Sequence, residues 1–350
     1  MKLNRISTAV VLATLLALGA CSTAEEVRSG NDEGSQSRAE EIAAELEPSD
    51  LKIAFFSSAT NNTYLQAGID GVKQAADEIG ASVDVFDGKF DAQVQFDQIQ
   101  SALTSGKYNA FVVEANDGNL LCDILTQDAP KQGVLVSTMN QPICGRATNA
   151  GDELWEPGTV TFVGGQTLDV YQAWIESIMS DNPDGGQVAV ISGPDLGANT
   201  INLNEALGTM EEDPSFEIVA NQKTDYSTPQ GFDAAQTILQ ANKNLDIIIS
   251  NYSGMTQGVV EAVKAGNRLN DVRVYDMGGD KWAIDAVKRG DLAQSVIFLP
   301  ELEGYTSVKA IGDFVTGKEV EKFINLTESD TLPGTPFVSK DNFDQFDPEY

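Results

Sequence analysis

The chain has 350 residues, with 53 Asp and Glu against 22 Lys and Arg, and its formal net charge at pH 7 is −31. A charge of this sign repels phosphate backbones, so the composition argues against nucleic-acid binding and favours a strongly solvated surface. The sequence also contains no histidine, which excludes Ser-His-Asp catalysis, Cys-His catalysis and zinc sites built on imidazole.

The first 20 residues have the three regions of a secretory signal. Lys2 and Arg5 form a basic start, residues 9–20 are almost wholly apolar, and a small residue precedes Cys21. The apolar stretch is too short for a permanent transmembrane helix, which needs about 20 apolar residues. The tetrapeptide LGAC resembles the lipobox of bacterial lipoproteins, whose cysteine carries lipid. We therefore predict that residues 1–20 are removed and that Cys21 anchors the exported protein to the outer face of the cytoplasmic membrane; a plain signal peptide with a chance cysteine is the alternative.

Residues 21–50 are rich in Ser, Glu, Gly and Asp and contain too few large apolar side chains to form a core. This composition predicts a flexible linker, which a lipid-anchored domain needs in order to stand clear of the membrane. A short surface helix through the stretch AEEIAAELE is compatible with the same role.

Cys122 and Cys144 are the two cysteines that remain once Cys21 is assigned to lipid. An exported chain folds in a compartment that permits disulfides, and an even number of cysteines favours pairing. We therefore predict a disulfide between them, with two free buried thiols as the alternative.

From Leu51 onward, apolar runs of strand length alternate with amphipathic stretches of helical period. The first half contains the runs LKIAFFSS, SVDVFDG, AFVVEA, VLVSTMN and VTFVGG. After Gly165 the alternation starts again with QVAVISG, FEIVANQ, LDIIISN, VRVYDMG and AQSVIFLP. This order predicts parallel α/β sheets. Because one sheet with that many strands is unusual, we predict two doubly wound, Rossmann-like lobes.

Ligands of doubly wound sheets bind outside the carboxyl ends of the strands, so two facing lobes predict a cleft between those ends. The loops at these positions are rich in amides and aromatic residues: SSATNNTYLQAG, EANDG, TMNQP, SGPDLGANTINLN, TDYSTPQG, SNYSGMTQG and DMGGDKW. Amides donate and accept hydrogen bonds as hydroxyl groups do, and aromatic faces cover the C–H face of a sugar ring. The loops predict a site for a neutral ligand with many hydroxyl groups; the alternative is that these residues only serve turns and helix caps.

The stretches TNNTYLQAGIDGVKQAADEIGASVDVFDG, VKRGDLAQSVIFLP, VTGKEV and FVSKDNF follow one another in a characteristic order. In this order the chain from Leu51 to its end resembles the type I periplasmic solute-binding proteins of the ribose-binding group. The resemblance implies two lobes that are joined by three crossover strands and close on a sugar as a hinge. It also implies delivery of a sugar or polyol to the permease of an ABC importer, with no cofactor, no metal and no catalytic residue.

The resemblance places the crossings near Gly165, near Leu299 and after Phe323. The expected N-terminal lobe comprises residues 51–165 and 299–323, and the expected C-terminal lobe comprises residues 166–298 and 324–350. Ten ligand-contact positions are implied, which are Asn62, Tyr64, Asn140, Gln141, Asn202, Tyr226, Asn251, Asp276, Asp280 and Phe298.

Several of these positions depart from the family pattern. The Asp-Arg pair of ribose-type members falls on Asn140 and Gln141, and a family glutamine falls on Phe298. The family arginine of the SGPDLGANTINLN loop has no counterpart, and the nearest polar positions are Asn199 and Asn202. Amides and apolar surface thus replace charge-assisted hydrogen bonds. We therefore expect another pentose or hexose, a polyol or a less polar sugar derivative in place of ribose.

Two further positions differ from the family. A second aromatic residue of the first loop is replaced by Leu65, and the aspartate of the DMGGD loop falls on Gly278, with Asp276 and Asp280 beside it.

The alternative from another class is an exported, carboxylate-based hydrolase that uses Glu114, Asp276 or Asp280, and turnover of the ligand would distinguish it. A sugar sensor coupled to a signalling receptor would share the fold. A sugar-responsive repressor is disfavoured because the lipobox stands where a helix-turn-helix would be.

Overall fold

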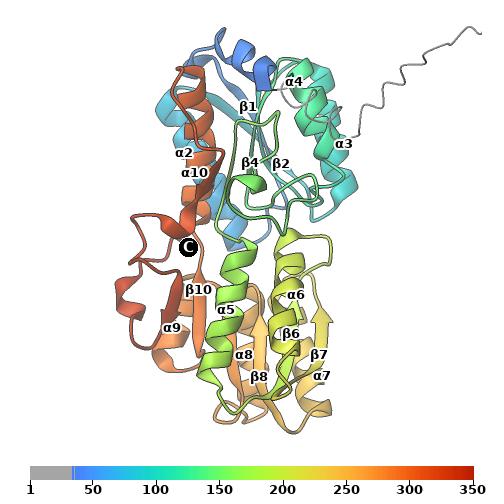
Figure 1. Ribbon diagram of the computed structural model, residues 1–350, viewed down its shortest axis with the longest axis vertical. Helices are drawn as coiled ribbons and strands as arrows, with labels where there is room; N and C mark the ends of the chain where they lie inside the picture. The colour runs from blue at the N-terminus through green and yellow to red at the C-terminus, as the bar shows by residue number, and fades with distance from the viewer. Residues whose placement is uncertain (1–33, 35) are drawn as a thin grey trace, which may run out of the picture.

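The strand-length apolar runs of the sequence form the two sheets of the protein (Figure 1). The computed structural model describes residue 34 and residues 36–350, so the expected signal sequence, Cys21 and the first part of the expected linker lie outside the described residues. Residues 36–43 form a helix, in agreement with the surface-helix alternative for this stretch. Its Ala39 and Ile42 are buried in the same apolar cluster as Leu51, so the described part of the linker packs on the first lobe.

The first lobe is built on a six-stranded parallel sheet in the order β11-β5-β4-β3-β1-β2. Its strands are β1 (Lys52–Ser57), β2 (Ser82–Asp87), β3 (Ala110–Glu114), β4 (Leu135–Met139), β5 (Thr161–Gly164) and β11 (Phe323–Asn325). The central strands β1, β3 and β4 are buried along nearly their whole length, as expected for parallel strands with helices on both faces. The helical segments are η1 (Pro48–Asp50), α2 (Thr63–Ile79), α3 (Ala92–Ser105), η2 (Ile124–Asp128), α4 (Ala129–Lys131), η3 (Gly151–Leu154), α10 (Pro300–Val315) and η4 (Leu326–Glu328).

The second lobe is built on a six-stranded sheet in the order β12-β10-β9-β8-β6-β7. In this sheet β12 is antiparallel to β10, and the other pairs are parallel. Its strands are β6 (Gly186–Ser192), β7 (Phe216–Lys223), β8 (Leu245–Ser250), β9 (Arg273–Gly278), β10 (Gln294–Ile297) and β12 (Phe337–Ser339). The helical segments are α5 (Leu168–Asp181), α6 (Ala198–Glu211), α7 (Thr228–Ala241), α8 (Ser253–Ala265), α9 (Lys281–Arg289) and η5 (Phe343–Gln345).

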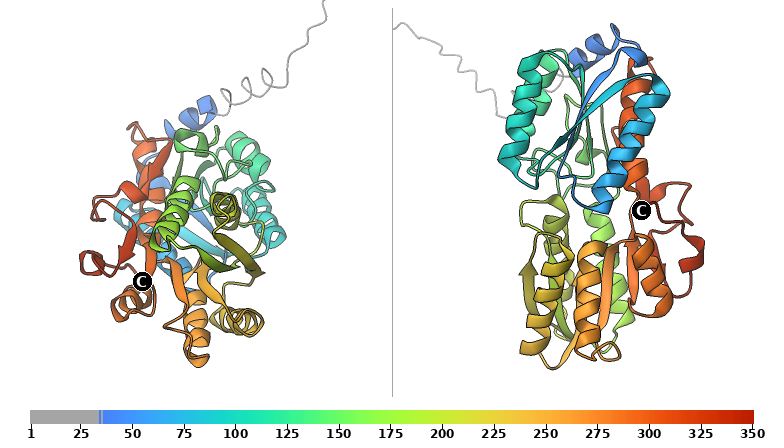
Figure 2. Two further views of the ribbon diagram at one scale, coloured as in Figure 1. Left: turned by 60° about the horizontal axis from the view of Figure 1, so that its bottom comes forward. Right: turned by 180° about the vertical axis from the view of Figure 1, so that it is seen from behind.

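The chain passes between the two sheets at three points. β5 of the first sheet is followed by α5 of the second lobe, β10 by α10, and β11 by β12. We refer to these as the first, second and third crossings. The C-terminal end of the chain lies at the level where the two lobes meet, as seen from the front in Figure 1 and from behind in Figure 2. Segments far apart in the sequence therefore gather at one junction.

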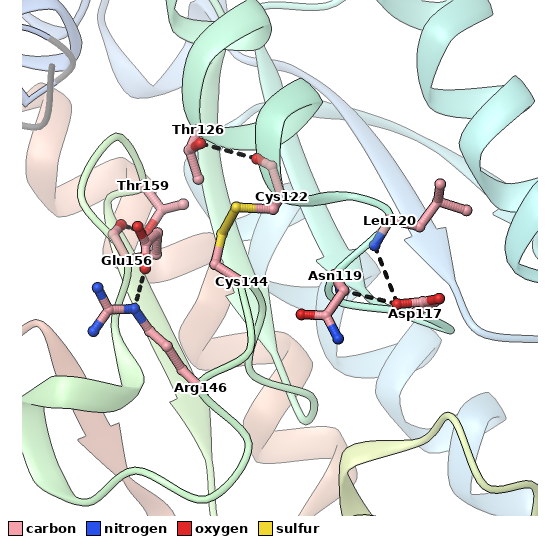
Figure 3. Close-up of a disulfide and its surroundings, with 9 residues drawn as sticks. All are labelled: Asp117, Asn119, Leu120, Cys122, Thr126, Cys144, Arg146, Glu156 and Thr159. Carbon is pink, nitrogen blue, oxygen red and sulfur yellow. Dashed lines mark hydrogen bonds and ion pairs between the residues drawn. A yellow bond between two sulfur atoms is a disulfide. The ribbon is translucent and has the colours of Figure 1, made fainter. Parts of the chain in front are cut away.

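The predicted disulfide forms between Cys122 and Cys144 (Figure 3). Cys122 lies after β3 and Cys144 lies after β4, and the Cys144 N–H donates to the Gly118 carbonyl oxygen at 2.9 Å. Closing a loop with a sequence separation of 22 residues stabilises the fold by about 3 kcal/mol in the chain-entropy model. The disulfide thus holds together two strand-end loops of the first lobe.

Among the described residues, no helix has the length and apolarity needed to cross a membrane.

Helices α2 and α10 lie side by side, as Figures 1 and 2 show from opposite directions. Their contact requires glycine at two positions. A Cβ on Gly71 would lie 1.9 Å from the Glu301 carbonyl oxygen, and a Cβ on Gly304 would lie 2.2 Å from the Gly68 carbonyl oxygen. No side chain fits between the two backbones at these points. This contact fixes α10, which begins at the second crossing, on the first lobe.

Gly71→Ala is expected to destabilise the protein, whereas Gly208→Ala is expected to stabilise it slightly. Both glycines lie inside helices, but a Cβ on Gly208 in α6 would have no atom within 4 Å. At Gly71 the added methyl group pushes α2 and α10 apart, at a cost of ~1–3 kcal/mol or more. At Gly208 the gain in helix propensity is about 0.5–1 kcal/mol. Urea denaturation followed by circular dichroism measures both changes, and equal effects of the two substitutions would contradict the close-contact argument.

Candidate ligand-binding site

The carboxyl ends of the strands in both sheets open onto one cavity between the lobes. The empty space of the cavity is about 880 Å³, which includes solvent space at its open mouth. Residues at or just after the end of each strand from β1 to β10 contribute to its lining. This is the position at which doubly wound sheets bind their ligands, because successive strand-to-helix loops meet at that edge.

The lining of the cavity is neutral apart from one carboxyl group. Among the described residues it contains no Lys or Arg, and Glu114 is its one acidic residue. Burial raises the pKa of Glu114 to about 7, and hydrogen bonds from Ser57 and Ser58 offset this rise only in part. No group of three or more Cys, Asp or Glu within residues 36–350 could hold a metal ion. The other polar lining groups are amides and hydroxyls, so the cavity suits an uncharged ligand with hydroxyl groups.

Most of the predicted contact residues line this cavity: Asn62, Tyr64, Asn140, Gln141, Tyr226, Asn251 and Phe298. The cavity is also lined by Leu65 and Gly278, on which a family aromatic residue and a family aspartate fall, and by Asn199, a polar position near the missing family arginine. They come from both lobes, as an inter-lobe site requires.

Asn202 and Asp280 are not among the lining residues. Asn202 is fully buried, and its Nδ2 donates to the Gln166 carbonyl oxygen at 3.1 Å. Asp280 accepts a hydrogen bond from the Ala283 N–H at 2.7 Å and is the N-cap of α9. Each side chain therefore serves a local structural role. The sequence did not distinguish Asn202 from Asn199, since either can face the ligand until the helix is oriented.

Asp276 is also absent from the lining. It is fully buried beneath the second sheet's carboxyl edge, where the Ser253 and Ser295 hydroxyls donate to its Oδ2 at 2.8 and 2.6 Å. Burial raises the pKa of Asp276, and these hydrogen bonds oppose the shift. Of the carboxylates that the hydrolase alternative requires, only Glu114 reaches the cavity. The arrangement therefore lacks a carboxylate pair for catalysis.

An aromatic contact joins the two lobes at the cavity. Phe90 follows β2 and Tyr226 follows β7, and their ring centroids lie 6.0 Å apart; Tyr226 also packs edge-on against Tyr252 at 5.8 Å. Phe90 and Tyr226 have φ angles of 53° and 65°, which are unusual for bulky residues and occur most often at functional sites. Phe90 was not among the contact positions predicted from the sequence. The available signal was a large aromatic residue between the strand end at Asp87 and the helix cap at Asp91.

The Tyr64 hydroxyl lies at the centre of a buried hydrogen-bond network, which we call the Tyr64 network. It donates to Glu303 Oε2 at 2.9 Å and accepts from Asn140 Nδ2 at 2.6 Å and Gln166 Nε2 at 3.0 Å. Gln166 lies at the first crossing, and Glu303 lies in α10 just after the second. Burial raises the pKa of Glu303 well above its ordinary value, and the charge of Glu114 adds to this rise. The network therefore connects two crossings to the strand-end loop that carries Asn140.

Gln141 extends the Tyr64 network to the second lobe. Its Nε2 donates to Asn140 Oδ1 at 2.5 Å, and its Oε1 accepts from the Ala198 N–H at 2.6 Å. Asn140 has a φ of 60°, and the Gln141 N–H donates across it to the Met139 carbonyl oxygen at 2.6 Å. This is a three-residue turn. Its central position is strained, and asparagine tolerates that backbone conformation better than most residues do. The side-chain amides of Asn140 and Gln141 are both engaged by protein atoms.

Asn251 differs from these two amides because it has unused hydrogen-bonding capacity. It follows β8 and is 4% exposed, and neither its Oδ1 nor its Nδ2 completes a hydrogen bond of normal geometry. Burial raises the pKa of the Tyr226 hydroxyl, and Asn251 is one of the groups that oppose the rise, so the amide lies beside that hydroxyl. A buried amide without partners costs free energy. A ligand hydroxyl placed here would recover that free energy.

The last two residues of the chain bind both lobes at the junction. The Glu349 carboxylate accepts from two backbone N–H groups in the first turn of α10, at 2.7 and 3.3 Å. The Tyr350 hydroxyl donates to the Gly278 carbonyl oxygen in the second lobe at 2.8 Å. The Tyr350 ring packs edge-on against Tyr64 of the first lobe, with centroids 5.7 Å apart. This segment thus forms a third tie beside the first and second crossings.

The residues that match a known domain are those that form this two-lobed site. A profile of the periplasmic binding protein domain matches residues 53–319. The chain belongs to the periplasmic binding protein family. The D-apiose import binding protein of Actinobacillus succinogenes is 26% identical over 249 residues, which cover 71% of this chain and 76% of the relative. The D-allose-binding periplasmic protein of Escherichia coli is 25% identical over 252 residues, which cover 69% and 78%.

Solved structures of periplasmic binding proteins share the fold. An ABC-transporter solute-binding protein of Bacillus halodurans with bound myo-inositol superposes with a TM-score of 0.73 at 20% identity, over 86% of this chain and 98% of that one. Family membership identifies the protein as a solute-binding protein and not an enzyme, and it places the protein outside the cytoplasm. The two α/β lobes have the predicted type I arrangement.

The stability of this periplasmic binding protein is expected to rise when the pH is lowered from about 8 to about 6. Burial raises the pKa of Glu349 to about 7 and that of Asp280 to about 6, as it does for Glu114. The folded protein therefore binds more protons than the unfolded chain, and the stability associated with these groups is lost as the pH rises through the folded-state pKa values. Thermal unfolding at pH 6, 7 and 8 measures the effect.

Glu349→Gln should weaken this pH dependence, because it removes one of the titrating groups. Asp213→Asn is the matched control. Hydrogen bonds from Ser215 lower the pKa of Asp213, so that group titrates below the tested range. A melting temperature that rises between pH 6 and pH 8 would contradict the analysis.

Proposed function

We propose that the protein binds a neutral sugar or polyol between its lobes and delivers it to the permease of an ABC importer. The observation that carries the proposal is the neutral inter-lobe cavity, in which Asn251 presents an unpaired amide beside aromatic rings. The cavity lies at the carboxyl ends of the strands of both lobes, which is where doubly wound folds bind small molecules. The names of the D-apiose and D-allose relatives support a ligand of monosaccharide size.

The lining favours a compact ligand with a hydroxyl-rich edge and an apolar face. Leu65, Phe90, Met277 and Phe298 supply apolar surface to the cavity. No described cation lines it, so it offers no charge-assisted hydrogen bond to a carboxylate or phosphate on the ligand. A deoxy sugar or another less polar monosaccharide fits this chemistry better than a phosphorylated or acidic sugar.

The ligand contacts that we propose come from both lobes. Asn62 and Phe90 approach from the first lobe. Tyr226 and Asn251 approach from the second lobe, and Phe298 approaches from the second crossing. Amides would bind ligand hydroxyls, and aromatic rings would cover C–H surface. Because the contacts lie on opposite sides of the cavity, a bound ligand favours the closed arrangement of the lobes.

We also propose that lipid on Cys21 and the linker that follows hold the protein at the outer face of the cytoplasmic membrane. The basic start, the short apolar stretch and the LGAC tetrapeptide support this placement. A tether brings the binding protein within reach of the permease without adding any contact between the two.

A thermal-shift screen of the protein from Ser22 onward tests the proposed function. The panel contains D-apiose, D-ribose, D-allose, D-fucose, myo-inositol and glycerol. At a hundredfold excess over Kd a true ligand adds about 2.7 kcal/mol of stability, so at least one compound should give a saturable rise in melting temperature and be recovered unchanged. No shift with any compound would contradict the sugar proposal, and product formed in proportion to protein would support the hydrolase.

Asn251→Ala locates this binding in the cavity. The substitution should raise the Kd at least tenfold, which is about 1.4 kcal/mol, and should leave the ligand-free stability unchanged or higher because no hydrogen bond is lost. Asn109→Ala is the matched control, because Asn109 does not line the cavity and its amide accepts from the Lys52 N–H at 2.7 Å and donates to the Asp50 carbonyl oxygen at 3.0 Å. Its loss should leave the Kd unchanged and lower the ligand-free stability by about 1 kcal/mol. Calorimetry gives Kd and urea denaturation gives stability; an unchanged Kd in Asn251→Ala would remove Asn251 from the site.

Cys21→Ser tests the lipid anchor. Because serine has no thiol to accept lipid, the variant should remain uncleaved or lack its anchor. The processed form should therefore be missing from the membrane fraction. Ser22→Ala, at the neighbouring position, should behave as the unmodified protein. Fractionation followed by mass spectrometry of the N-terminal peptide measures both, and a Cys21→Ser protein that is still processed and membrane-bound would overturn the assignment.

A further inference from the structure

We propose that Gln141 is a closing latch between the lobes, which holds them together through the main chain of Ala198 and does not contact the ligand. The proposal deepens the proposed function, since it assigns a role in closure to one residue of that site. It starts from the position of Gln141, which follows β4 in the first lobe, while Ala198 is the first residue of α6 in the second.

Both polar groups of the Gln141 amide are hydrogen-bonded to protein atoms. It is 7% exposed, its Oε1 accepts from the Ala198 N–H at 2.6 Å, and its Nε2 donates to Asn140 Oδ1 at 2.5 Å. A buried amide with both of its groups in short hydrogen bonds has little capacity left for a ligand. The one lining amide in the described chain with neither group paired is Asn251.

The partner on the second lobe is a helix terminus that lacks a cap of its own. The N-cap of α6 is Gly197, which has no side chain to accept from the first turn. The Gln141 carbonyl oxygen accepts one of the backbone N–H groups that a helix start leaves unpaired, and the positive end of the helix dipole strengthens this contact. The first lobe thus caps a helix of the second lobe. Opening the cleft breaks that cap.

The latch is attached to a rigid support. Asn140, which fixes the Gln141 amide, is held by the turn at Met139 and by its hydrogen bond to Tyr64. On the other side Cys144 joins this loop to the preceding strand-end loop through the disulfide. A pre-organised acceptor loses little side-chain entropy when it binds. The contact can therefore contribute measurably to closure.

Every atom in the latch belongs to the protein, so its strength does not depend on the ligand. Such a contact lowers the free energy of the closed state by the same amount whatever the ligand is. It therefore raises affinity for all ligands by one common factor and leaves the ratio of their affinities unchanged. A residue that touches the ligand would instead change that ratio.

Two variants remove the hydrogen bond between the lobes from opposite sides. Gln141→Leu deletes the acceptor at nearly constant volume, but it also removes the Gln141 hydrogen bond to Asn140 within the first lobe, so Ala198→Pro is the variant that removes the inter-lobe bond alone. Ala198→Pro deletes the donor at the first helical position, where proline is favoured, and Gly197 before it has a ψ of 135°, which suits a residue that precedes proline. Gln132→Leu is the matched control, because it makes the same change at an exposed turn of the first lobe.

Each single variant should raise the Kd about fivefold, the effect expected for one neutral hydrogen bond, and by the same factor for D-allose and D-fucose or for the two tightest binders of the panel. The double variant should be no weaker than either single variant, because both remove the inter-lobe hydrogen bond. The ligand-free radius of gyration, measured by small-angle X-ray scattering, should be larger in both single variants than in the unmodified protein or in Gln132→Leu.

A change in Kd that differs from one ligand to another, or multiplies in the double variant, would overturn the latch. An unchanged radius of gyration in both single variants would overturn it as well. If Gln141→Leu does not fold by circular dichroism, Ala198→Pro tests the same bond alone. If no sugar binds, the proposed function fails, whereas the scattering of the ligand-free variants still decides whether Gln141 holds the lobes.

Discussion

The Tyr64 hydroxyl is the group at which the connections between the two lobes meet. It accepts from Gln166 at the first crossing and donates to Glu303 after the second, and the Tyr64 ring packs against Tyr350, which follows the third. A buried hydroxyl with its donor and both acceptor sites engaged tolerates little displacement, because any lost partner leaves a desolvated polar group. The geometry of the junction, and so of the cavity above it, depends on this point.

Few of the acidic side chains of the protein lie at the cavity beside this junction. Of 53 acidic residues in the chain, Glu114 is the one among the described residues that lines the cavity. Glu303, Asp276 and Asp280 lie nearby, but burial raises the pKa of each and hydrogen bonds hold each in place. The strongly acidic surface keeps the protein soluble, while the cavity is reserved for neutral groups. This separation explains how one chain can be so acidic and still suit an uncharged ligand.

In the closure that we propose for the cleft, two kinds of contact have different consequences. Asn251 offers unpaired groups to a ligand, so its contribution depends on where the ligand places its hydroxyls. Gln141 pairs with protein atoms on the opposite lobe, so its contribution is the same for every ligand. Selectivity then comes from the first kind of contact, and part of the affinity comes from the second. A site that exchanges guanidinium–carboxylate contacts for amides can recover binding free energy in this way without binding charge.

Sequence patterns were enough to predict the two-lobed α/β fold, the disulfide between Cys122 and Cys144, and the edge of the sheets onto which the cavity opens. Strand-length apolar runs and their alternation with amphipathic helices are local signals, and two cysteines remain once Cys21 is assigned to lipid. Parallel strands bring their carboxyl ends together whatever their register. The family resemblance added the candidate positions.

Whether an amide at such a position pairs with another protein group depends on how distant segments pack, which the local pattern does not contain. Asn202 and Asp276 lie within a few residues of the lining residues Asn199 and Gly278, but the orientation of α6 and the position of Asp276 inside β9, two residues before the strand end, place them in the interior. Asn140 and Gln141 line the cavity, yet their hydrogen-bonding groups are taken by Tyr64 and by Ala198, which are distant in the sequence. A local pattern shows which groups can form hydrogen bonds, but the partner of each depends on which distant segments the fold brings within about 3 Å.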